Sequence, residues 1–97
     1  MAKAYWVSVY SAIHDESKLA AYAKLAGPAV EAGGGKPLAR GNAAKAYEAG
    51  VLQRVVLIEF PSLEAAIATH DGPGYQAALK ELGDGVTRDL RVVEGLE

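Results

Sequence analysis

The chain has 97 residues, of which 51% are hydrophobic, a formal net charge of −2 and no cysteine. This length fits one small domain over residues 1–97, and the apolar content excludes a disordered segment. The lack of cysteine excludes disulfides and thiolate metal sites, and the balanced charge argues against a nucleic-acid partner. We expect a cytoplasmic protein with no membrane partner, because no apolar run reaches the roughly 18 residues of a membrane span.

The first half of the chain predicts a strand, a helix and a second strand. Residues Tyr5–Ile13 are rich in β-branched and aromatic side chains, which favour a strand. Asp15 can cap a helix over residues 16–32 that bends at Gly27-Pro28, because an interior proline loses a backbone hydrogen bond. Glycines at 33–35 end the helix, and residues 36–40 predict a strand that is interrupted near Gly41-Asn42.

The second half predicts a strand, a broken helix and a last strand. Val51–Phe60 has the strongest strand pattern in the chain, and Ser62 can cap the helix that follows. Asp71-Gly72-Pro73 interrupts this helix, a further helical stretch runs to Leu82, and Val86–Glu94 predicts the last strand. The order βαββαβ is typical of a ferredoxin-like α+β domain with a four-stranded antiparallel sheet and its helices on one face.

The third strand predicts a partner for the sheet. Val55, Val56, Leu57 and Ile58 place apolar groups on both faces of the sheet, and the helices can cover only one face. A second copy packed sheet against sheet would cover the other face. We therefore expect a homodimer.

The stretch GGGKPLARGN at residues 33–42 has the composition of a phosphate-binding loop but lacks its spacing. A Walker A motif needs a glycine where Val30 stands and a serine or threonine where Pro37 stands. The dinucleotide motif needs a glycine where Leu38 stands. We therefore expect a helix end and a connector here, with no nucleotide cofactor.

Arg40 is the first candidate for a functional site. It shares a strand face with Leu38, so it needs either an ion-pair partner, for which Glu59 on the neighbouring strand is a candidate, or a wet cleft. In a cleft, its planar guanidinium suits a ligand carboxylate or enolate. The sequence leaves both interpretations open.

The two histidines are the next candidates. His14 lies where the first strand meets its helix, and His70 ends the apolar stripe of the second helix beside Asp71. Each can be a packing residue or an acid–base group. Two histidines without closely spaced carboxylates do not predict a metal site.

Aromatic side chains complete the candidate set. Trp6 shares a face of the first strand with Ser8 and Tyr10, whereas Tyr22 and Tyr75 come from helices. The ferredoxin-like topology directs His14, Arg40 and residues 70–75 toward one edge of the sheet. Such residues can form the wall of a small-molecule pocket or belong to the ordinary core.

Five segments, in this order and spacing, resemble the short bacterial proteins grouped as domain of unknown function 1330. They are YW at 5–6, LARGN at 38–42, VVLIEFPSLEAAI at 55–67, GPGYQAAL at 72–79 and RVVEG at 91–95. The resemblance spans essentially the whole chain and implies a ferredoxin-like subunit that dimerises into an α+β barrel. It implies no reaction, since the wider superfamily includes cofactor-free monooxygenases, haem-degrading enzymes, lactone isomerases, polyketide cyclases and sensing domains.

The chain departs from the family pattern at three places. Asn42 replaces the second glycine of the family pattern, Thr69-His70 replaces an aromatic pair, and Leu82 replaces an arginine. The matching positions that are kept are Arg40, Glu59 and Tyr75. The departures indicate that any site of the family is modified in this chain.

Together these observations predict a homodimer that binds a small aromatic or carboxylate-bearing metabolite in a cleft between sheet and helices. Arg40 would anchor the anionic group, His70 or Tyr75 would handle a proton, and the other ligand contacts would be Glu59, Trp6, Tyr22, His14 and Asp71. No cofactor is implied, and any reaction would be proton transfer or cofactor-free oxygenation. The alternative is a non-enzymatic dimerisation or small-molecule-sensing domain, which a closed space around an Arg40–Glu59 pair would favour.

Overall fold

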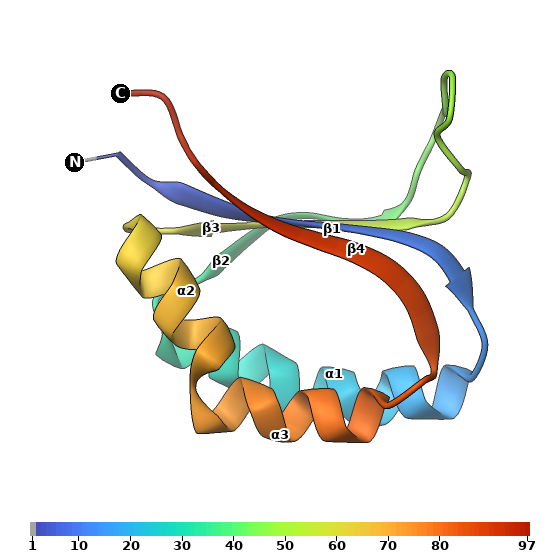
Figure 1. The fold of residues 1–97 in the computed structure, drawn as a ribbon, viewed down its shortest axis with the longest axis horizontal. Coiled ribbons are helices and arrows are strands. Elements are labelled where there is room, and N and C mark those ends of the chain that lie inside the picture. Colours follow the sequence, from blue (N-terminus) through green and yellow to red (C-terminus); the bar gives the residue numbers. More distant parts are fainter. Residues whose placement is uncertain (1) are drawn as a thin grey trace.

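The computed structural model describes residues 2–97 and has the predicted order βαββαβ, with the second helix in two parts (Figure 1). The elements are β1 (Ala4–Ile13), α1 (Glu16–Ala32), β2 (Lys36–Asn42), β3 (Arg54–Phe60), α2 (Leu63–Asp71), α3 (Pro73–Leu82) and β4 (Val86–Glu94). The bounds of α1 and β4 are those that the sequence predicts. β2 continues through Gly41 without interruption, and β3 begins later than expected because Gln53 N donates to Val51 O (2.8 Å) and closes a turn before it.

The four strands form one antiparallel sheet in the order β2-β3-β1-β4. All the helices lie on one side of it, and α1 packs along α3 (Figure 1). This is the ferredoxin-like α+β fold, so the fold prediction is confirmed. No helix within residues 2–97 is long and apolar enough to cross a membrane.

Local signals in the sequence position α1. Asp15 Oδ1 accepts hydrogen bonds from the backbone N–H groups of Ser17 (3.0 Å) and Lys18 (3.2 Å), which satisfies two of the free donors of the first turn. At the other end, Gly34 adopts φ 88°, a left-handed conformation that suits glycine. The glycine run is therefore a helix end followed by a strand, as the failed phosphate-loop spacing predicts.

The second helical region is divided at Gly72. Ser62 Oγ accepts from Ala65 N (3.1 Å) and caps α2, which ends at Asp71. The backbone of Gly72 is extended, and Pro73 begins α3, where its missing N–H costs no hydrogen bond. The break turns the chain, so that α3 runs beneath the sheet beside α1 (Figure 1).

The hydrophobic core lies between the sheet and the helices, towards the α2 end of the sheet. Its largest fully buried side chains are Trp6, Phe60 and Tyr75. The Trp6 ring centroid lies 4.9 Å from that of Phe60 and 4.8 Å from that of Tyr75, and Trp6 Nε1 donates to Ala66 O at 3.0 Å. This packing joins β1 and β3 to α2 and α3.

The other face of the sheet carries no helix. Val9 and Val93 are 43% and 52% exposed, and the strand register directs them away from the helices, opposite to buried Ser8 and half-buried Val92. The loop at residues 43–53 and the C-terminal tail extend on this same side (Figure 1). The uncovered apolar face that the β3 sequence predicts is therefore present.

Candidate functional site

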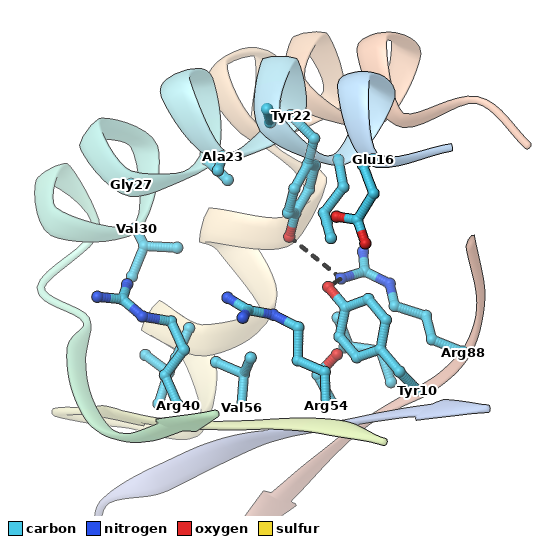
Figure 2. Close-up of a pocket in the computed structure, with 16 residues that line it drawn as sticks. Tyr10, Glu16, Tyr22, Ala23, Gly27, Val30, Arg40, Arg54, Val56 and Arg88 are labelled. Atoms are coloured by element: carbon cyan, nitrogen blue, oxygen red, sulfur yellow. Dashed lines mark hydrogen bonds between the residues drawn. The ribbon is translucent and has the colours of Figure 1, made fainter. Parts of the chain in front are cut away.

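A cavity of about 290 Å³ lies between the sheet and α1, next to the aromatic core. This volume is at the lower end of the range for small-molecule pockets, roughly 300–1,000 Å³. Most of the wall is apolar, and the polar side chains come mainly from the strands (Figure 2). The polar lining residues are Ser8, Tyr10, Glu16, Tyr22, Arg40, Arg54 and Arg88.

Strand register brings these polar side chains into two neighbouring rows. Arg40 is the cross-strand partner of Val56, and Val56 is the partner of Ser8. In the next row Tyr10 is paired with Arg88. Arg54 immediately precedes Val55, the partner of Val9, and therefore lies beside Tyr10 on the other side of β1. The rows all face α1, which places three arginines in one cavity.

Arg88 is held by three tyrosine hydroxyls. Its Nη1 donates to Tyr10 Oη at 3.1 Å and Tyr22 Oη at 3.2 Å, and its Nη2 donates to Tyr75 Oη at 3.0 Å. The guanidinium also lies over the rings of Tyr10 and Tyr22, at 5.6 Å and 5.0 Å from their centroids. Figure 2 shows Arg88 and the hydroxyls of Tyr10 and Tyr22 meeting below the start of α1.

The ionisation states in this cluster follow from burial and contact. Burial alone would lower the pKa of Arg88, but the interactions with Tyr22 and Tyr75 outweigh it and raise that pKa above its ordinary value. Burial, and then the proximity of Tyr22, raises the pKa of the Tyr75 hydroxyl well above its usual range. At neutral pH Arg88 is therefore a cation and Tyr75 keeps its proton.

Arg40 and Arg54, by contrast, are unpaired cations. Neither guanidinium forms a hydrogen bond or ion pair with another residue of the described chain, residues 2–97. Arg54 Nε is buried without a partner, and so is Oγ of Ser8, a residue only 4% exposed. Buried polar atoms are nearly always hydrogen-bonded in proteins, so two orphans beside one cavity make this cavity the candidate functional site.

Three of the site residues predicted from the sequence belong to this region. Arg40 and Tyr22 line the cavity, with Arg40 on the exposed edge strand and Tyr22 on α1. Tyr75 lies directly behind Tyr22, its hydroxyl oxygen 2.5 Å from that of Tyr22. Trp6 belongs to the buried core next to the cavity rather than to its lining.

The remaining predicted site residues lie elsewhere, and the expected convergence at one sheet edge is not observed. His14 Nε2 is 2.8 Å from Thr87 Oγ1 on β4, at the opposite sheet edge from Arg40 on β2. His70 packs its ring 5.2 Å from that of Tyr75, and its Nδ1 is 3.0 Å from Asp71 Oδ1, outside the cavity lining.

The Arg40–Glu59 pair suggested by the sequence is not formed. Glu59 Oε1 is 3.2 Å from Lys3 Nζ instead. The reason is the register: Glu59 lies three residues after Val56, the partner of Arg40, and so projects from the opposite face of the sheet. A closed space around such a pair would have favoured a structural role for Arg40, and the structure has an open cavity there.

Sequence reasoning missed Arg54 and Arg88 as site residues. A signal for both was present, because each continues an alternating strand pattern on the core side: Arg54 with Val56 and Ile58, and Arg88 with Leu90 and Val92. An arginine on the inner face of a strand must find a partner or a cavity. Within residues 2–97 there is no group of three or more His, Cys, Asp or Glu side chains arranged to hold a metal ion.

Comparison with solved structures shows the same fold. The chain aligns over 99% of its length with a protein of unknown function, RPA0582 from Rhodopseudomonas palustris, covering 84% of that chain at 20% identity and TM-score 0.78. A dimeric ferredoxin-like protein of unknown function from Thermobifida fusca YX has 20% identity and TM-score 0.62, over 97% of this chain and 90% of that one.

A third similar structure comes from Caulobacter crescentus CB15 and is named a "putative antibiotic biosynthesis monooxygenase". Its identity is 18% and its TM-score 0.62, over 99% of this chain and 92% of that one. No curated protein matches the chain at a significant level. The family model described as "Domain of unknown function (DUF1330)" matches residues 3–96, and the chain belongs to that family.

Proposed function

We propose that this protein binds a small carboxylate-bearing molecule in the cavity between the sheet and α1. The observation that carries the proposal is the pair of unpaired guanidinium groups, Arg40 and Arg54, beside the orphaned donor Arg54 Nε and the orphaned Ser8 Oγ. A planar guanidinium binds a carboxylate through two parallel hydrogen bonds. A bound carboxylate would therefore pair with the two guanidinium groups that have no ion-pair partner within residues 2–97.

The charge distribution supports an anion rather than a neutral or cationic ligand. The whole chain has a formal net charge of −2, yet the cavity is lined by three arginines and a single acidic side chain, Glu16. Cations gathered in a cleft with low-dielectric walls raise the local concentration of anions. The apolar lining from α1 and the strands, such as Leu19, Ala23 and Ile58, suits a flat hydrocarbon or aromatic body.

Proton transfer on the bound molecule is a second candidate function, and the phenol cluster favours it. Tyr22 is the tyrosine that both lines the cavity and contacts Arg88 and Tyr75. Because the pKa of Tyr75 is raised, Tyr75 would act as a hydrogen-bond donor and not as a base. His70, the other residue proposed from the sequence for this role, lies outside the cavity lining, so we assign the role to Tyr22.

We also propose that two copies of the chain pack through the uncovered face of the sheet. Val9 and Val93 on that face, with Tyr47, Val51 and Leu52 in the loop beside it, are large exposed apolar side chains. Large apolar side chains that are exposed on the same side of a monomer indicate an interaction surface. The similar Thermobifida fusca protein is described as dimeric. A second copy of the same chain can cover this face by packing its own uncovered face against it.

Thermal unfolding with a matched pair of probes tests the ligand proposal. Benzoate and benzamide have nearly the same shape, but only benzoate carries a charge. Benzoate should raise the Tm in a concentration-dependent way and benzamide should not, because a ligand that binds the native state stabilises it. Arg54→Met should abolish the benzoate effect. The control Lys24→Met removes one positive charge from the exposed surface of α1, outside the cavity lining, and should leave the effect intact.

Equal effects of the two probes, or an unchanged benzoate effect in Arg54→Met, would rule the carboxylate site out. The dimer is tested separately by light scattering. Wild type should have twice the 10.1 kDa chain mass, and Val9→Lys should have the monomer mass. Leu25→Lys changes an apolar residue of similar exposure, 41% against 43%, on the helical side and should stay dimeric. A monomeric wild type would refute the interface.

A further inference from the structure

The hydrogen bonds around Arg88 determine which way the tyrosine protons point. A guanidinium can only donate, so each of the three hydroxyl oxygens of Tyr10, Tyr22 and Tyr75 accepts one hydrogen bond from Arg88. Each hydroxyl still has its own hydrogen to donate. One of these three hydrogens lies between Tyr22 and Tyr75, whose oxygens are 2.5 Å apart.

Burial decides which tyrosine donates within that pair. Tyr75 is 1% exposed, and Tyr22 Oη is the hydrogen-bond acceptor available to it among residues 2–97. If Tyr22 donated to Tyr75, the Tyr75 hydrogen would be buried without an acceptor, which is unfavourable. Tyr75 therefore donates to Tyr22, and the Tyr22 hydrogen is left for the cavity. The raised pKa of Tyr75 agrees with a hydroxyl that keeps its proton.

The hydroxyl group of Tyr10, like that of Tyr22, has a hydrogen that is free to donate. Its oxygen accepts from Arg88, and its hydrogen has no acceptor within the described chain. Both hydroxyls belong to residues that line the cavity, and Figure 2 shows them beside Arg88 at the end of the cavity away from Arg40. Glu16 also lines this end, but no hydrogen bond joins it to either tyrosine in residues 2–97.

We propose that Tyr10 and Tyr22 form a two-donor subsite that binds an uncharged or anionic oxygen acceptor, such as a ketone, enolate or second carboxylate oxygen. The ligand class is then an oxo acid or a dicarboxylate with a flat apolar body. This inference rests on the proposed carboxylate site, because Arg40 and Arg54 hold the acid group at the other end. The two hydroxyl donors and the Arg88 cation outnumber the single acidic side chain at this end, Glu16, so the subsite favours an oxygen acceptor over an amine.

The subsite has the features of a preorganised donor pair. Arg88 and Tyr75 fix the two hydroxyl oxygens from behind, so the hydrogens need no rearrangement when the acceptor enters. A matched ligand that lacks the acceptor oxygen leaves both hydrogens unpaired. Sites of this kind discriminate strongly against such analogues.

Two probes of equal charge and similar shape test the subsite: 4-acetylbenzoate, which carries a ketone oxygen, and 4-isopropylbenzoate, which carries a methyl group in its place. Isothermal titration should show that wild type prefers 4-acetylbenzoate by about 100-fold, which is about 10-fold for each of the two hydroxyl hydrogens that 4-isopropylbenzoate leaves unpaired. Tyr22→Phe should reduce this preference, and Tyr10→Phe with Tyr22→Phe should bring it to about 1-fold. The control Tyr5→Phe removes a tyrosine hydroxyl that is not part of the cavity lining or of the Arg88 cluster, and should keep the preference.

The outcomes separate this inference from the proposed function. If both probes bind with equal affinity and Arg54→Met weakens both, the carboxylate site stands and the donor subsite is refuted. A preference that is unchanged in the double variant also refutes the subsite. If neither probe binds wild type at millimolar concentration, the subsite and the carboxylate site are both refuted.

Discussion

Arg54→Met should make the protein more stable while removing ligand binding. Arg54 Nε is buried without a hydrogen bond, and the guanidinium faces two other arginines across the cavity. Methionine keeps an unbranched apolar side chain in the same place but has no charge and no N–H group. The variant therefore removes an unsatisfied donor and a source of like-charge repulsion.

The size of the effect follows from two opposing contributions. An unsatisfied buried polar group costs about 1–3 kcal/mol, which the substitution recovers. The Arg54 guanidinium lies 5.9 Å from the centroid of the Tyr10 ring. This contact contributes about 0.5–1 kcal/mol, which the substitution loses. We therefore expect a net stabilisation of about 1 kcal/mol, or a rise in Tm of about 4–8 °C for a domain of this size.

Thermal unfolding followed by circular dichroism measures this change, with all variants at the same protein concentration because an oligomer's Tm depends on it. Arg40→Met is the matched control. Arg40 lines the same cavity and is also unpaired, but it lies exposed on the edge strand and should change stability by less than about 0.5 kcal/mol. A lower Tm for Arg54→Met than for wild type would refute the reasoning, because it would mean that Arg54 contributes to folding and not to binding.

Two further substitutions test how the elements are positioned. In Gly35→Ala, the new Cβ would lie 2.5 Å from Val30 Cγ1, so the variant should lose about 1–3 kcal/mol of unfolding free energy in urea. Gly41→Ala meets nothing within 4 Å and should be neutral or slightly stabilising, and equal losses for both would contradict this. The pKa of the Asp15 carboxyl in the folded protein is below 3.8, above all because the Ser17 side chain donates a hydrogen bond to it. The ionised carboxylate therefore stabilises the fold at pH values above its unfolded pKa, and this stabilisation is lost as the pH falls through its folded pKa. The Tm difference between wild type and Asp15→Asn at about pH 7 should therefore shrink at about pH 2, and a constant difference would show that the carboxylate charge plays no part.

Local chemistry made most of the fold predictable. The capping residue Asp15, the three glycines at 33–35 and the break at Gly72-Pro73 are signals that act within a few residues, and each has its expected effect. The predicted start of β3 was wrong because Val51 has the composition of a strand residue but lies in the loop before it. Dimerisation and a cytoplasmic location stay predictions.

The candidate site was less predictable, because it depends on register. Arg40 and Glu59 lie on neighbouring strands, and only the pairing of Arg40 with Val56 shows that they project from opposite faces. Arg88 lies far along the chain from Tyr10 and Tyr22, so neither spacing nor composition indicates their contact.

The most direct test of the central claim is the NMR signal of the Arg54 Nε–H group during titration with benzoate and, separately, benzamide. This N–H is a buried donor that has no hydrogen-bond partner within residues 2–97. We expect benzoate to shift the Arg54 resonance in a saturable way, and benzamide at the same concentration to leave it in place. A resonance that stays in place while benzoate shifts signals on the other face of the sheet would contradict the account.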